Sequence, residues 1–235
     1  MSPALIVAFL RQRLTSPLRI ILLGFSFLAP LGAVAITRNL SVLEGSPLWF
    51  AFILAAGAIG QEVSSGVLTL TFARPLRRSA YVFSRWAGAG GFAAALGLVQ
   101  LAIGVMVIVA RGTVPPGADA AALALECVFV SFTGAALMVM LSSLVNGLGD
   151  VGVWVIVTLV GSLVGGIARA EDWSALERAA QELQLTLIPS VHAGWLFGAG
   201  DPQPYGLIAA LSTLTASLAV AVWVVNRKEL SYAAG

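Results

Sequence analysis

The chain has 235 residues, of which 59% are hydrophobic and only 10% charged, and its mean hydropathy is +0.95. A soluble domain carries about 25% charged residues, so this composition excludes an ordinary water-soluble protein. The net charge of +2 is explained by arginines near a membrane and does not indicate nucleic-acid binding. One cysteine, Cys127, and one histidine, His192, cannot make an intrachain disulfide or the usual zinc sites.

Residues 1–17 predict a helix that lies on the membrane surface. The apolar residues of this segment recur at helical spacing, and Arg11 and Arg13 mark its polar side. The apolar positions are Leu5, Ile6, Phe9, Leu10 and Leu14. We expect the helix to end near Ser16 and Pro17; the alternative is that it extends the first membrane span.

Six apolar windows predict six membrane-spanning helices, and hence an all-α, polytopic membrane protein with one transmembrane domain over residues 1–235. They cover residues 18–36, 47–60, 86–110, 120–145, 151–168 and 205–225. The second window is too short alone, so its helix begins near Val42 or continues past Glu62. The first window also resembles a signal peptide, which is the alternative for that segment. Five glycines in the third window predict close helix packing: Gly88, Gly90, Gly91, Gly97 and Gly104.

The distribution of basic residues predicts the orientation of these spans. If the amino terminus is cytoplasmic, the inner segments hold nine basic residues and the outer segments hold four. Cytoplasmic loops are enriched in arginine and lysine, so we expect both termini in the cytoplasm.

Residues 169–204 form the longest outer segment, and we expect short extracytoplasmic helices there before the last span. Ser174 and Glu177 fit a capping box, which predicts a helix over residues 174–186 that ends at Pro189. Residues 191–199 fit either a re-entrant helix or an interfacial helix with an aromatic anchor.

Residues 60–85 form a polar stretch between two apolar windows. Glu62 follows the second window, Gly66 interrupts the next turns, and Pro75 forces a corner in the chain. The stretch also holds four arginines, Arg74, Arg77, Arg78 and Arg85. Moving four arginines into hydrocarbon would cost on the order of 10 kcal/mol, so this stretch lies outside the lipid core.

The order of residues in this stretch resembles the first cytoplasmic loop of ABC type-2 transporter permeases. The matching residues are Glu62, Gly66, Leu68, Leu70, Pro75, Arg78, Tyr81 and Arg85. The resemblance implies that residues 61–85 contain a coupling helix that docks on a separate ATP-binding-cassette ATPase subunit. It implies contact with that subunit through Glu62, Gly66, Arg74, Pro75, Arg78 and Tyr81. It further implies an exporter made of two permeases, either a homodimer or a heterodimer.

The chain itself lacks a sequence that could bind ATP through a phosphate-binding loop. Such a loop needs a lysine after a glycine, and the only lysine, Lys228, follows an arginine. We therefore expect the chain to bind no cofactor and the partner ATPase to bind ATP. No nucleophile–base pair is evident, so we do not expect an enzyme.

Two polar residues within the windows are candidates for a transport pathway or gate. Gln100 lies deep in the third window, and Glu126 lies near the outer end of the fourth. The structural alternatives are a helix–helix hydrogen bond for Gln100 and a water-exposed position for Glu126. Residues 146–150 are expected to form an ordinary inner turn, and the alternative that the resemblance implies is a second contact with the ATPase. An ion-driven carrier and a non-transporting membrane anchor remain alternative functions.

Overall fold

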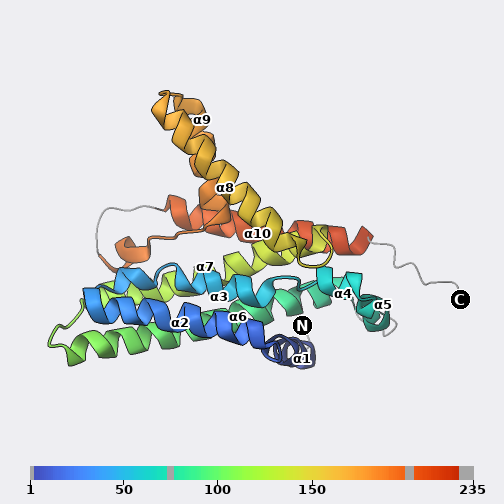
Figure 1. Cartoon of the computed structure of the whole chain (residues 1–235), viewed down its shortest axis with the longest axis horizontal. Coiled ribbons are helices and arrows are strands. Elements are labelled where there is room, and N and C mark those ends of the chain that lie inside the picture. The colour runs from blue at the N-terminus through green and yellow to red at the C-terminus, as the bar shows by residue number, and fades with distance from the viewer. Residues whose placement is uncertain (1–2, 73–76, 199–203, 228–235) are drawn as a thin grey trace, which may run out of the picture.

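The computed structural model of the chain describes residues 3–72, 77–198 and 204–227, and this part is helical without any strand (Figure 1). Twelve helical elements follow one another: α1 (Pro3–Leu14), α2 (Pro17–Thr37), η1 (Leu40–Leu43), α3 (Ser46–Ala55), α4 (Gly60–Ser64), α5 (Val67–Phe72), α6 (Arg78–Ala110), α7 (Gly117–Leu144), α8 (Gly149–Ala170), α9 (Ser174–Leu187), η2 (Ala193–Phe197) and α10 (Tyr205–Arg227).

Within the described residues, six helical segments are long and apolar enough to cross a membrane, as the sequence predicts. They are α2, the composite segment Leu40–Ser64, α6, α7, α8 and α10. The chain is therefore an all-α, multi-pass membrane protein. The second span begins before Val42 and also continues past Glu62, so both expected solutions to its short apolar window are found together.

Helix α6 is longer than its apolar window and begins at Arg78. Its 33 residues extend roughly 50 Å at 1.5 Å per residue, whereas a hydrocarbon core is about 30 Å thick. Helix α6 is therefore several turns longer than the core is thick. This length is compatible with the expectation that the arginines of residues 60–85, including Arg78 and Arg85 in the first turns of α6, lie outside the lipid core.

Helix α1 is separate from the first span, which excludes the alternative that it extends this span. Figure 1 shows α1 almost end-on while α2 and α6 run across the view, so α1 crosses the end of the bundle. One prediction for this helix is wrong, because Arg13 does not lie on the polar side. Arg13 is 1% exposed and, four residues after Phe9, lies on the same buried face.

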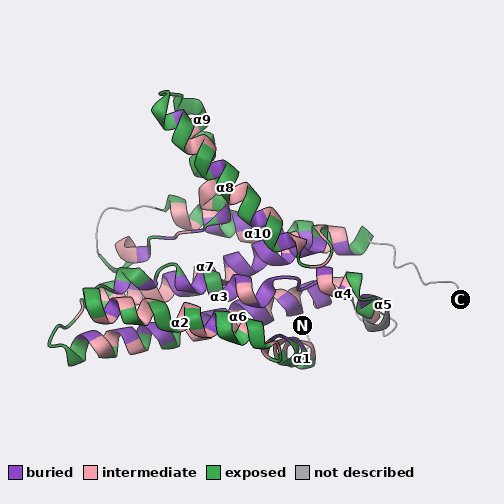
Figure 2. Cartoon of the chain, viewed as in Figure 1, coloured by how far each residue is buried: buried purple, intermediate pink, exposed green. Residues whose placement is uncertain are grey.

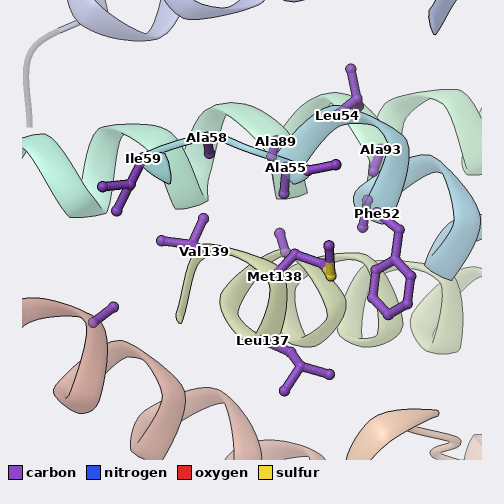
Figure 3. Packing of buried hydrophobic residues seen from close by; sticks show 14 of the residues in the cluster. Phe52, Leu54, Ala55, Ala58, Ile59, Ala89, Ala93, Leu137, Met138 and Val139 are labelled. Carbon is purple, nitrogen blue, oxygen red and sulfur yellow. The ribbon is translucent and has the colours of Figure 1, made fainter. Parts of the chain in front are cut away.

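The core forms where α3, α6 and α7 meet. Figure 3 shows Met138 and Val139 of α7 on the side that faces Ala55 and Ala89, whereas Leu137 points the other way. Small residues allow this close approach, as a Cβ added to Gly97 would lie 2.4 Å from the sulfur of Cys127. The prediction of close glycine packing along α6 is confirmed at four of the five positions, Gly88, Gly90, Gly97 and Gly104. Gly91 faces open space.

Helices α8 and α9 form a hairpin that leans away from the other spans (Figure 1). The expected helix in residues 174–186 is confirmed as α9, but its capping box is wrong. The Ser174 side chain makes no capping hydrogen bond, and Glu177 instead pairs with Arg169 at 2.9 Å. Among the described residues between α9 and α10, the 3-10 turn η2 is the one helical element, and it packs against α7.

The orientation of the chain stays a prediction that cysteine labelling can test. In a Cys127→Ser background, Ser64→Cys on exposed α4 is expected to react only with reagent on the cytoplasmic side. Arg178→Cys on exposed α9 is expected to react only from the opposite side. Because both positions are exposed, the reverse pattern would overturn the predicted topology.

Candidate functional site

The second span is broken just before the polar stretch of residues 60–85. Helix α3 ends at Ala55 and α4 begins at Gly60, and Gly57 in the break adopts a left-handed φ of +66°. Residues 56–60 are all buried, so their backbone groups need hydrogen-bond partners within the protein. We call residues 56–60 the junction.

Arginines from α1 and α2 satisfy the carbonyl groups of the junction. Arg13 donates from Nη1 to the Ala56 carbonyl at 3.1 Å and from Nη2 to the Gly57 carbonyl at 2.8 Å. Arg19 donates to the same Ala56 carbonyl at 3.2 Å, and both arginines also donate to Oε1 of Gln61. These charged donors neutralise the partial negative charge at the carboxyl end of α3.

Side chains from α8 and α7 satisfy the N–H groups of the junction. The carboxylate of Asp150 accepts the Gly57 N–H at 2.6 Å. The hydroxyl of Ser142 accepts the N–H groups of Ile59 and Gly60 at 3.0 and 2.9 Å. Both side chains are fully buried. The junction is therefore held by polar groups from α1, α2, α7 and α8.

The turn between α7 and α8 completes the junction. Gly147 donates its N–H to the Gly60 carbonyl at 2.9 Å. A Cβ at Gly60 would lie 2.5 Å from the Val145 carbonyl oxygen, so only glycine fits there without moving the backbone. Residues 146–150, expected to be an ordinary turn or a partner contact, thus lie against the second span.

A buried ion pair holds α4 against α6 immediately after the junction. Glu62 accepts a hydrogen bond from Arg85 at 2.5 Å and another from the Tyr81 hydroxyl at 2.6 Å. The Arg85 guanidinium also lies over two rings, 4.9 Å from the centroid of Phe9 and 4.8 Å from that of Tyr81. This contact connects α1, α4 and α6.

The junction and the ion pair bring five charged side chains close together. They are Arg13, Arg19, Arg85, Glu62 and Asp150. Burial lowers the pKa of Arg13 to about 10, and repulsion from Arg19 and Arg85 adds to this effect. Arg13 therefore remains protonated at neutral pH and keeps its donor role.

The residues predicted to contact an ATPase occupy three kinds of position. Glu62 and Tyr81 are buried against each other, so in this structure they hold α4 in place and do not form its surface. Arg78 donates to the Asn226 carbonyl at the end of α10 at 2.8 Å. Gly66 is exposed, with a φ of +71°, between α4 and α5. Arg74 and Pro75 lie outside the described residues.

Gln100 repairs a helix that a proline interrupts. Pro30 has no N–H, so the Ser26 carbonyl, four residues earlier in α2, loses its helical donor. The Gln100 amide donates to this carbonyl at 3.2 Å and to the Phe27 carbonyl at 2.7 Å. Its position is that of the structural alternative, a hydrogen bond between helices.

Replacing Gln100 with leucine is expected to lower the free energy of unfolding by about 1 to 2 kcal/mol, because the Ser26 carbonyl loses its donor. In a Pro30→Ala background the helix supplies its own N–H, so the same replacement should cost less. Thermal unfolding of the four proteins measures this coupling. An equal cost in both backgrounds would rule out the repair of Pro30.

Glu126 is 7% exposed, so it is largely covered by protein, and its access to water is through a cavity that it lines. Its carboxylate accepts the Val191 N–H at 3.2 Å, which fastens the segment before η2 to α7. This cavity has a volume of about 480 Å³ and is also lined by Glu44, Asp119 and His192. A role in a transport pathway stays a prediction for this residue.

Sequence reasoning missed four residues whose side chains bond to the junction, Arg13, Arg19, Ser142 and Asp150. A signal existed for Arg13, because its spacing from Phe9 places it on the apolar face of α1. For Asp150 the signal was an acid directly before an apolar window in a five-residue turn. Ser142 gave none, because a serine in a span most often bonds within its own helix.

Comparison of the chain with family models and with curated proteins finds no match. The resemblance to ABC type-2 permeases therefore depends on residues 60–85 and on the predicted topology. The geometry of the junction is the independent observation from which a function can be argued.

Proposed function

We propose that the chain is the membrane-spanning permease subunit of an ATP-driven exporter of the ABC type-2 kind. In this proposal a separate ATPase subunit binds ATP and docks on the segment from α4 to α5. A second permease, identical or homologous, completes the assembly, and both termini lie in the cytoplasm.

The observation that supports the proposal most is how α4 is attached to the spans. Residues 64–67 at the end of α4 and the start of α5 are exposed, whereas Gly60 and Glu62 at its beginning are buried. A partner that pushes on the exposed residues would move α6 through the ion pair of Glu62 and Arg85. It would move α1 and α8 through the hydrogen bonds of Arg13 and Asp150 to the junction.

A second argument comes from the contact of Arg78 with α10. Arg78 donates to the last carbonyl groups of α10, at 3.2 Å for Val225 and 2.8 Å for Asn226. The first turn of α6 is therefore connected to the last span as well. Movement of this turn would reach spans that are far apart in the sequence, which is what a coupling segment requires.

Cross-linking in native membranes tests the proposal. In a Cys127→Ser background, Ser64→Cys is expected to form a cross-link through a short bifunctional reagent with a protein that also takes up a photoreactive ATP analogue. Arg178→Cys, exposed on α9, is the matched control and should not. Cross-links to nucleotide-labelled protein from both positions, or from neither, would contradict docking at α4 and α5.

A further inference from the structure

A long apolar groove opens on the side of the bundle between α2 and α8. It has a volume of about 940 Å³, at the upper end of the ~300 to 1,000 Å³ of small-molecule sites. Helix α2 packs on α3, and α8 packs on α7, so α3 and α7 form the floor of the groove. Figure 2 shows α2 and much of the hairpin of α8 and α9 as exposed or half-buried.

The groove is built into the fold because the root of α8 is fixed while its tip leans away. Asp150 ties the first turn of α8 to Gly57 in the junction. One turn later, Trp154 packs edge-on against Phe52, with ring centroids 4.5 Å apart. Beyond this contact the helix leaves the bundle (Figure 1), and the α8 residues that line the groove run from Val151 to Val155.

The groove has one charged end. Among the described residues that line it, Arg19 is the only charged one, and it lies beside Ser16 and Gln61. The half-buried Arg19 guanidinium uses Nη2 for its hydrogen bonds, and Nε and Nη1 have no hydrogen-bond partner among the described residues.

The cluster around Arg19 holds more positive than negative charge, although Asp150 attracts Arg19. Glu62 pairs with Arg85, which leaves Arg13 and Arg19 with Asp150 as the remaining acid of the cluster. The carboxylate of Asp150 is already bonded to the N–H groups of Gly57 and Val151. The cluster thus carries one excess positive charge at the mouth of an apolar groove, and the amino end of α2 adds to the positive potential there.

We propose that this groove is a binding site for an anionic phospholipid of the surrounding bilayer. The phosphate accepts hydrogen bonds from Nε and Nη1 of Arg19, and an acyl chain lies along α2 and α8. The lining residues of α2 run from Leu18 to Pro30, roughly 18 Å at 1.5 Å per residue. One leaflet of a ~30 Å core is about 15 Å deep, so the groove accommodates a full acyl chain.

The charge at Arg19 distinguishes this occupant from two others. A zwitterionic lipid would fill the groove equally well but would leave the excess charge uncompensated. A second copy of the chain would bring its own α2 and α8 surfaces, which among their groove-lining residues carry only another Arg19. An anionic headgroup is therefore the complementary partner.

Lipid binding to the purified chain, measured by native mass spectrometry, tests the site. Phosphatidylglycerol and phosphatidylcholine with identical acyl chains are compared. Because a charged hydrogen bond distinguishes the two, the wild type is expected to bind phosphatidylglycerol about tenfold more tightly. Arg19→Gln should remove this preference, whereas Arg11→Gln, an exposed arginine of α1 outside the groove, should keep it.

A second variant keeps the test decisive if Arg19→Gln fails to fold. Val155→Trp fills the groove from α8 without touching a charge, and it should weaken the binding of both lipids. Equal binding of the two lipids by the wild type would overturn the proposal. So would an undiminished preference in Arg19→Gln or undiminished binding in Val155→Trp. A dimer that Val155→Trp dissociates, with no lipid preference, would identify the occupant as a second copy.

Discussion

Glu62→Ala is expected to lower the free energy of unfolding by about 3 to 5 kcal/mol, because it leaves the charge of Arg85 buried without its partner. Glu62 is 3% exposed and Arg85 is 7% exposed, so water cannot replace the lost contact. At roughly 2 to 4 °C for each kcal/mol, the thermal midpoint of the purified protein should fall by roughly 6 to 20 °C. The loss of the hydrogen bond from Tyr81 adds to this effect.

The double variant Glu62→Gln with Arg85→Met is the matched control. Glutamine still accepts the hydrogen bond of Tyr81, and no unpaired charge stays buried, so this protein should unfold within about 1 kcal/mol of the wild type. A double variant as unstable as Glu62→Ala would show that the effect is lost packing. A single variant as stable as the wild type would contradict the buried ion pair itself.

Arg13→Ala is expected to cost about 2 to 4 kcal/mol, from the loss of charged hydrogen bonds to the junction and of the packing of the side chain on Phe9. Arg11, two positions earlier, is exposed on the same helix. Arg11→Ala should therefore stay within about 0.5 kcal/mol of the wild type. Thermal unfolding of the two variants measures this difference. Equal midpoints would mean that Arg13 does not stabilise the junction.

The spans could be predicted from the sequence because hydrocarbon imposes one dominant constraint. A helix that crosses the membrane needs about 20 apolar residues, and no charge within them is tolerated without cost. For this reason window 18–36 coincides with α2, and window 205–225 with α10, to within two residues at each end. The same constraint explains why window 47–60, which was too short, needed flanking residues.

The junction could not be predicted in the same way, because it depends on contacts between distant segments. Gly57 and Gly60 allow the break, but glycines are common in spans and nothing local shows that this pair ends a helix. Arg13 and Asp150 were counted as ordinary inner charges, since composition cannot distinguish an arginine in water from one bonded to buried carbonyl groups. The direction in which α8 leans could not be predicted for the same reason, because it depends on contacts of the first turns of α8 with distant segments.

The family resemblance and the structure give different positions to the same residues of the segment 60–85. The sequence pattern pointed to Glu62 and Tyr81 as surface contacts, whereas the structure places them beneath the surface that Ser64 and Gly66 form. We therefore expect a partner to touch the exposed residues and the buried ones to pass its movement to the spans. Substitutions of the exposed residues should then weaken binding of the partner. Substitutions of the buried residues should leave binding intact and weaken the coupling of the partner's movement to the spans.

The most direct test of this account is ATP hydrolysis by the assembly purified from membranes through this chain, with the wild type compared with the double variant Glu62→Gln with Arg85→Met. We predict that an ATPase co-purifies with both proteins and that the double variant hydrolyses ATP several-fold more slowly at a temperature where both are folded. Equal hydrolysis by the two assemblies, or transport by the purified chain without any ATPase, would contradict it.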